Sequence, residues 1–133
     1  MQIGVESARS VENRRIFVVD EDEINRAALQ FMLHDENETH EFSGIDAALE
    51  KSANWKPDLL ILGIGMVEAG LLQKLKERID DLSIMIVTDA ENLSAAVACL
   101  KSGADAIVAK PLFVEIVRGK VDALFERRLS WQP

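Results

Sequence analysis

Short apolar runs alternate with longer amphipathic stretches along this chain, and this alternation constrains the fold more than any other feature. Five runs are predicted to be strands, at residues 16–19, 39–42, 59–62, 84–87 and 106–109. The first, third and fourth runs are apolar at every position, which is typical of parallel strands covered on both faces. The second run, Thr-His-Glu-Phe, is more polar, so we expect it at an edge of the sheet.

The stretches between the runs carry apolar residues at helical spacing. In the first stretch this stripe consists of Ile24, Ala27, Ala28, Phe31 and Met32. Four further stripes follow: Ile45, Ala48 and Leu49; Leu71, Leu72 and Leu75; Leu93, Ala96, Val97 and Leu100; and Phe113, Ile116, Val117, Val121, Leu124 and Phe125. Because a β-α-β connection crosses over right-handed and places helices on both faces, we predict a doubly wound α/β fold with a five-stranded parallel sheet and five helices.

The length of 133 residues fits one domain with one hydrophobic core. We place this domain at residues 14–129, after a flexible lead-in at 1–13 and before a tail at 130–133. Cys99 is the only cysteine, so no internal disulfide can form, and its apolar neighbours indicate a small buried side chain on a helix. His34 and His40 lack metal-ligand spacing and are predicted to be solvated.

Charge and hydropathy narrow the classes of partner. A net charge of −8 argues against a nucleic-acid backbone as the main partner and favours a basic protein surface. The arginine pairs at 14–15 and 127–128 are interpreted as solvated domain boundaries. The sequence shows neither a signal-peptide pattern nor an apolar run of roughly 20 residues, so we expect no membrane partner and a cytoplasmic location.

Polar residues and glycines follow the strands at the edge where an open parallel sheet usually carries its functional groups, beyond the carboxyl ends of the strands. Each single signal is weak, since acidic pairs and Thr-Asp steps are common, but their order along four strand ends is specific. The groups are Asp20-Glu21-Asp22 after the first strand, Gly63-Ile64-Gly65 after the third, Thr88 after the fourth and Lys110-Pro111 after the fifth.

The order of these groups resembles the receiver domain of two-component response regulators. The likeness extends over residues 14–128, and the Gly-Ala-Asp sequence at 103–105, just before the fifth run, adds to it. A member of that family has a CheY-like, flavodoxin-like sheet with the strand order 2-1-3-4-5 and takes part in phosphorelay signal transduction. The resemblance therefore implies that strand order and a signalling role, with no enzymatic activity of the chain's own.

The resemblance also implies a role for each group at the strand ends. Asp20 and Glu21, helped by the Gly65 backbone, would supply oxygen ligands for Mg²⁺, which neutralises charge during phosphoryl transfer. Thr88 would donate a hydrogen bond to a phosphoryl oxygen, and Lys110 would offset its negative charge. In the family, the peptide bond between that lysine and the following proline is often cis.

The central group of the family is missing. In this register the acceptor aspartate at the end of the third strand is replaced by Gly63, which has no side chain to phosphorylate. Asp58 lies upstream, roughly 16 Å away at about 3.3 Å per strand residue, so it cannot substitute. The loop at 64–69 is shorter than usual, and the aromatic reporter of phosphorylation is here Ile107. We predict a pseudo-receiver, without a catalytic residue, that works by protein–protein interaction.

The sequence leaves other interpretations open. Phosphorylation could move to Asp22 or Asp89, or Asp20 and Glu21 could pair directly with Lys110 without a metal. Asp20 and Asp22 also match the Asp-x-Asp motif of haloacid-dehalogenase-type phosphatases, but a later acidic pair is missing and the chain is short for that fold. A flavodoxin-type flavin site is set aside because the acidic residues after the first strand would repel its phosphate.

A partner surface is also implied by the family, in which the fourth helix, fifth strand and fifth helix commonly mediate dimers or docking. The partner would be a second copy of the chain, a histidine kinase or an output protein. No cofactor is required, although weakly bound Mg²⁺ is compatible with the acidic pair. On this chain the surface would carry Leu93, Ala96, Lys101, Ile107, Arg118 and Asp122.

Overall fold

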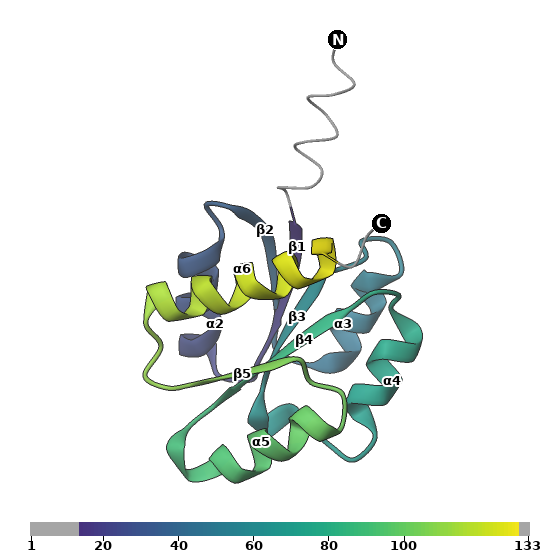
Figure 1. The fold of residues 1–133 in the computed structure, drawn as a ribbon. Coiled ribbons are helices and arrows are strands. Elements are labelled where there is room, and N and C mark those ends of the chain that lie inside the picture. The colour runs from purple at the N-terminus through teal and green to yellow at the C-terminus, as the bar shows by residue number, and fades with distance from the viewer. Residues whose placement is uncertain (1–13, 131–133) are drawn as a thin grey trace.

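Five parallel strands form one sheet in the computed structural model, which describes residues 14–130 (Figure 1). Their order is β2-β1-β3-β4-β5, as the resemblance implied. The strands are β1 (Arg14–Val19), β2 (Asn37–Phe42), β3 (Leu59–Gly63), β4 (Ser83–Thr88) and β5 (Ala106–Ala109). The polar strand β2 lies at an edge of the sheet, as predicted, although it begins earlier in the chain than expected.

Helices cover both faces of the sheet. The α-helices of the described part are α2 (Glu23–Leu33), α3 (Ile45–Ser52), α4 (Leu71–Arg78), α5 (Leu93–Lys101) and α6 (Val114–Ser130). Two short 3₁₀ helices, η1 (Ile64–Met66) and η2 (Ala90–Asn92), precede α4 and α5. Helices α2 and α6 pack on one face of the sheet, and α3, α4 and α5 pack on the other. The predicted doubly wound fold is confirmed.

The central strands are buried on both sides, because alternate residues point to opposite faces of the sheet. Every residue of β3 is buried. The core beneath α2 and α6 includes Ile16, Leu59 and Met85, and the core beneath α3, α4 and α5 includes Phe17, Leu60 and Ile84. Each fully buried Leu, Ile or Phe contributes about 1.5–3 kcal/mol relative to an exposed one, so the two cores hold the strand ends in register.

The prediction for α2 is wrong about the buried face of this helix. Ile24 is 78% exposed and Phe31 is 75% exposed, whereas Asn25 and Leu29 are buried. Both sets of positions have helical spacing and differ by one residue along the helix, so the pattern alone does not choose between them. The observed orientation turns the Asn25 amide toward the end of β1, where it donates a hydrogen bond to Asp20.

The Gly-Ala-Asp sequence shapes the opposite, amino-terminal edge of the sheet. Gly103 follows α5 with a φ of 125°, a conformation that favours glycine. Two residues later, Asp105 Oδ2 accepts hydrogen bonds from the Ile84 backbone N–H and from the Lys76 ammonium, both at 2.8 Å. The start of β5 is thereby joined to β4 and to α4.

The described part of the chain runs from β1 at Arg14 to α6 at Ser130. The predicted lead-in at 1–13 and the tail residues 131–133 lie outside the described residues. Within 14–130, no helix combines the length and the hydropathy that a bilayer span requires.

Candidate functional site

The strand register brings the predicted site residues to one edge of the sheet. The residue before Gly63 pairs with the last residue of β1, and Gly63 itself pairs with the penultimate residue of β4. Thr88 pairs with the last residue of β5. Asp20 and Lys110 come directly after β1 and β5. Four neighbouring strand ends therefore present these four residues at the carboxyl edge.

Asp20 is turned into the protein and is 6% exposed. Its Oδ1 accepts a hydrogen bond from the Asp22 backbone N–H at 2.9 Å, and its Oδ2 accepts from the Asn25 side-chain amide at 3.0 Å. Its backbone carbonyl accepts from the Arg26 guanidinium at 2.7 Å. A buried carboxylate needs such donors, because removing its charge from water is costly.

Gly63 leaves the space that the Asp20 carboxylate occupies. A Cβ atom added to Gly63 would lie 2.5 Å from Asp20 Oδ2 and 2.7 Å from Asp20 Cγ, closer than real non-bonded contacts. The Gly63 backbone, with φ −65° and ψ 140°, is extended and open to any residue type. The Asp20 side chain, rather than the backbone, is therefore what a larger residue at this position would have to displace.

The acidic residues at this edge do not fit the Mg²⁺ site that the resemblance implied. Both oxygens of Asp20 accept hydrogen bonds from N–H donors of the protein, and the carboxylate fills the space beside Gly63. Glu21 is exposed, and its Oε1 lies 3.5 Å from a Cβ built on Gly65, beside a cleft of about 670 Å³ between the loops that precede α3 and α4. Among residues 14–130, no group of three or more His, Cys, Asp or Glu side chains is placed to hold a metal ion.

Thr88 and Lys110 lie at the expected strand ends but make only local contacts. Thr88 is fully buried, and its hydroxyl donates to the Asp89 carbonyl at 2.9 Å. Lys110 is half-buried, its backbone N–H donates to the Thr88 carbonyl at 2.8 Å, and its bond to Pro111 is cis. In the described part of the chain, no carboxylate oxygen lies within 4.0 Å of the Lys110 ammonium. The alternative ion pair between this lysine and the acidic pair after β1 is not formed.

The other carboxylates considered as acceptors have capping or edge contacts. Asp22 Oδ1 accepts at 2.9 Å from a backbone N–H in the first turn of α2, and Asp89 Oδ1 accepts at 2.9 Å from a backbone N–H in η2. Each bond satisfies an N–H that a helix end leaves without an intrahelical partner. Asp58 precedes β3 at the opposite edge, where its Oδ2 accepts from the Arg15 N–H at 2.9 Å.

Sequence reasoning misses a cluster around Glu38 and His40 on the edge strand β2. His40 Nε2 lies 2.7 Å from Glu38 Oε2 and the ring is half-buried, so the prediction of a solvated His40 is wrong, whereas His34 is exposed as predicted. The Arg15 guanidinium donates to Glu38 at 2.7 Å, and the Trp55 ring packs edge-on against His40 with centroids 5.1 Å apart. The hydrogen bonds from Arg15 and then from His40 lower the pKa of Glu38. The available signal was the two-residue spacing, which puts positions 38 and 40 on one face of a strand.

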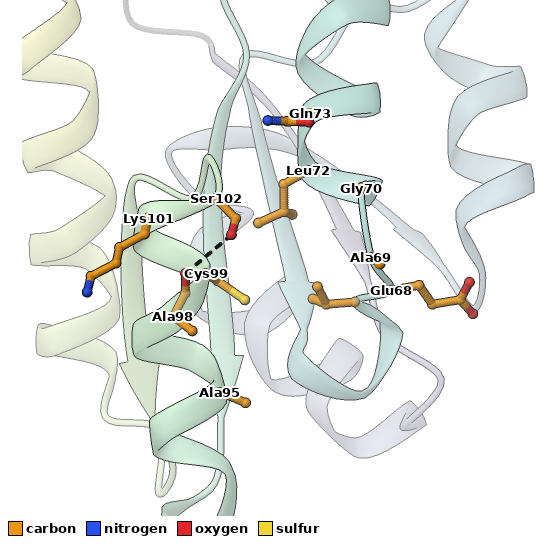
Figure 2. Close-up of a pocket in the computed structure, with 11 residues that line it drawn as sticks. Glu68, Ala69, Gly70, Leu72, Gln73, Ala95, Ala98, Cys99, Lys101 and Ser102 are labelled. Atoms are coloured by element: carbon orange, nitrogen blue, oxygen red, sulfur yellow. Dashed lines mark hydrogen bonds between the residues drawn. The ribbon is translucent and has the colours of Figure 1, made fainter.

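Helix α5 leaves most of its apolar residues exposed. Leu93, Val97 and Leu100 are between 42% and 45% exposed, and Ala96 and Cys99 are the buried residues of this helix. A groove of about 370 Å³ separates α5 from α4, and Figure 2 shows the Cys99 side chain pointing into it. Cys99 is nevertheless buried in the core beneath α3, α4 and α5, as predicted for a small apolar side chain, and burial raises the pKa of its thiol.

Two residues of the predicted partner surface make contacts within the domain. Ala96 is fully buried against the sheet. Arg118 Nε donates to the Met32 carbonyl at 2.7 Å and so reaches α2, on the other face of the sheet from α5. The members that are exposed or half-buried are Leu93, Lys101, Ile107, Arg118 and Asp122.

Sequence comparisons connect this chain with known proteins. A family model of the response regulator receiver domain matches residues 16–121. The response regulator MprA of Mycobacterium ulcerans (strain Agy99) is 35% identical over 118 residues, which cover 85% of this chain and 50% of MprA. MprA of Mycobacterium leprae (strain TN) is 33% identical over 118 residues, covering 85% of this chain and 51% of the relative. The chain spans about half the length of the curated relatives it matches.

Solved structures show the same fold. FixJ from B. japonicum has a TM-score of 0.79 at 21% identity, covering 87% of this chain and 59% of FixJ. A response regulator from Thermotoga maritima has a TM-score of 0.78 at 19% identity, covering 86% of this chain and 98% of that protein. NtrX from Brucella abortus in complex with ATP has a TM-score of 0.81 at 24% identity, covering 89% of this chain and 29% of NtrX. Since the family model spans most of the sheet and its helices, this chain belongs to the response regulator receiver domain family of two-component systems.

Proposed function

We propose that this receiver domain is not phosphorylated at the usual position and acts by protein–protein contact. One observation carries the proposal: the acceptor position is Gly63, and the Asp20 carboxylate fills the space of the missing side chain. An acyl phosphate forms only when a carboxylate oxygen attacks phosphorus. Gly63 has no such oxygen, and the oxygens of the buried Asp20 both accept hydrogen bonds from within the protein.

The neighbouring carboxylates are poorly placed to take over this role. Asp22 and Asp89 cap helices, so a phosphoryl group on either one would disturb a cap. No carboxylate of the described part lies within 4.0 Å of Lys110, the cation that would offset phosphoryl charge. The burial of Asp20 also argues against the phosphatase alternative, in which this residue would be the nucleophile.

Incubation with acetyl phosphate and Mg²⁺, followed by intact-mass measurement, tests the proposal. We expect no phosphoryl adduct on this chain under conditions that label a receiver domain carrying the acceptor aspartate, which serves as the positive control. A stoichiometric adduct, mapped by peptide mass spectrometry to any carboxylate of this chain, would overturn the proposal.

Helix α5 offers an exposed apolar surface, and we propose that a second copy of the chain covers it. A helix with apolar residues all around its circumference is normally buried, yet Leu93, Val97 and Leu100 are exposed. An antiparallel pair of α5 helices would place Leu93 of one copy opposite Leu100 of the other. The same pairing would bring Glu91, which precedes α5, near the end of the partner helix that carries Lys101, and both residues are exposed. The surface is therefore complementary to itself, as a two-fold dimer interface must be.

Sedimentation analysis over a concentration series tests the dimer, with Val97→Glu as the test variant. Phe31→Glu is the matched control, because Phe31 is an exposed apolar residue on the other face of the sheet. We expect the wild type and Phe31→Glu to dimerise and Val97→Glu to remain monomeric. A monomeric wild type, or dissociation caused only by Phe31→Glu, would contradict the dimer. The exposed residues of α2 would then be tested against a histidine kinase or an output protein.

A further inference from the structure

We infer that Asp20, Asn25 and Gly63 form a closed structural unit in place of a magnesium site, so that this receiver domain does not depend on the metal. The inference rests on the proposed function and states what the first acidic residue does when phosphoryl transfer is absent. The three residues come from the end of β1, the first turn of α2 and the end of β3. We call them the Asp20 unit.

The hydrogen bonds of Asp20 are those of a structural carboxylate. Its Oδ1 accepts from the Asp22 N–H at 2.9 Å, and its Oδ2 accepts from the Asn25 amide at 3.0 Å. Mg²⁺ demands oxygen ligands in nearly octahedral geometry, and each N–H bond leaves an Asp20 oxygen with one fewer lone pair to offer. A rotation of Asp20 away from its present position would break the Asn25 bond. The buried amide would then lack that acceptor, which is costly.

Packing favours the same arrangement. The Asp20 carboxylate occupies the space in which a Cβ at position 63 would lie, 2.5 Å from Oδ2. If Asp20 rotated toward solvent, the atoms around Gly63 would lose their contacts with it. The Gly63 backbone is extended and does not itself require glycine. A side chain at this position would therefore have to displace the Asp20 carboxylate.

The remaining carboxylates of the described part do not gather around one point beside Asp20. Glu21 borders the 670 Å³ cleft together with Asp46 and Glu68. These side chains are not gathered around one point, since residues 14–130 hold no group of three or more potential ligands placed to bind a metal ion. With Asp20 turned inward, the exposed Glu21 is left as a single carboxylate of the former pair at the cleft.

The Asp20 unit also predicts that restoring the acceptor does not by itself restore a metal site. In Gly63→Asp, the new Cβ would lie 2.5 Å from Asp20 Oδ2, so Asp20 must rotate away from Asn25. The bond from Asn25 opposes that rotation. We therefore expect Asn25→Ala/Gly63→Asp to bind Mg²⁺ at least about tenfold more tightly than Gly63→Asp alone, which is the lower end of the effect expected for one hydrogen bond to a charged group.

Titration of the isotope-labelled wild-type chain with MgCl₂, followed by nuclear magnetic resonance, tests the inference without any variant. The Asp22 backbone N–H and the Asn25 side-chain amide are the reporters, because both donate to Asp20. We expect their signals to stay in place through millimolar Mg²⁺. Saturable shifts of both signals would overturn the inference, and their loss in Asp20→Asn would identify Asp20 as the ligand.

Calorimetric titration of Gly63→Asp and Asn25→Ala/Gly63→Asp with MgCl₂ is the second measurement, after circular dichroism has shown that each is folded. Equal affinities would overturn the role of Asn25, and a variant that does not fold leaves the wild-type titration to decide. Neither titration contains a phosphoryl donor. Mg²⁺ binding by the wild type would therefore refute this inference alone, whereas a phosphoryl adduct in the mass experiment would refute the proposed function alone.

Discussion

The two edges of the sheet use buried or half-buried carboxylates in a similar way. At the amino-terminal edge, Asp105 accepts from the Ile84 N–H and the Lys76 ammonium, and so joins β5 to β4 and α4. At the carboxyl edge, Asp20 accepts from a backbone N–H and from the Asn25 amide, and so joins the end of β1 to α2. In both places a carboxylate holds structural elements together through N–H donors.

The two edges differ in their cations. Lys76 pairs with Asp105 at 2.8 Å, whereas no carboxylate of the described part lies within 4.0 Å of Lys110. The amino-terminal edge is a complete ion-paired junction, and the carboxyl edge keeps a lysine without its acidic partner. The comparison shows that the absence of a carboxylate at position 63 affects contacts at the carboxyl edge only. The amino-terminal edge retains the contacts that hold its strands together.

The largest effect is expected at the amino-terminal edge. Asp105→Ala should lower the free energy of unfolding by about 3 kcal/mol, because it leaves the Ile84 N–H and the Lys76 ammonium without their acceptor. Urea denaturation gives this difference from the shift in midpoint. Asp80→Ala, at an exposed residue near the same edge, is the control and should change little. Equal losses of unfolding free energy in both variants would show that the contacts of Asp105 do not stabilise the fold more than an exposed carboxylate does.

A smaller loss is expected from crowding the carboxyl edge. Gly63→Ala should lower the free energy of unfolding by about 1–3 kcal/mol, since its Cβ would lie 2.5 Å from Asp20 Oδ2. Gly65→Ala is the matched control, because its Cβ would lie 3.5 Å from Glu21 Oε1, an ordinary contact. Thermal melts of both variants measure the difference. If Gly63→Ala were as stable as Gly65→Ala, Asp20 would not occupy that space in solution.

A substitution of Thr88 tests whether the polar groups at the carboxyl edge have hydrogen-bond partners within the protein. Thr88→Val should cost about 1 kcal/mol, because the bond from this buried hydroxyl to the Asp89 carbonyl is lost. Thr39→Val provides the comparison, since the buried Thr39 hydroxyl makes no hydrogen bond in the structure and its loss should cost nothing. Chemical denaturation of the two variants under one set of conditions should reproduce this order. The reverse order would mean that Thr88 does not bond as described.

The smallest effect concerns acid stability near the start of β1. The pKa of Glu38 is lowered below its ordinary 4.5 by Arg15 and then by His40, so its contribution to stability is present above pH 4.5 and is lost as the pH falls through the folded-state pKa. Glu38→Gln should therefore be less stable than the wild type at neutral pH, and the gap should close in acid. Melting temperatures across this range measure the gap. Glu36→Gln, at an exposed residue, should show no such convergence.

Much of this arrangement could be predicted because a strand that is covered on both faces has an apolar residue at nearly every position. The apolar run of β3 predicted its two-sided burial, and counting along that run placed Gly63 at its end. The buried face of α2 could not be predicted, since Ile24 and Asn25 begin two stripes with the same spacing. Docking against the sheet chose the stripe of Asn25, and that choice supplied the donor for Asp20.

The sequence by itself determined the alternation of strands and helices and the residue type after each strand, including the missing carboxylate at position 63, because local periodicity and register settle both. Only the tertiary structure decided that Asp20 points inward. Its direction depends on a donor from α2 and on empty space above Gly63. Asn25 lies on another element and Gly63 is distant in sequence, so both come into contact with Asp20 only when α2 and the strands have packed together.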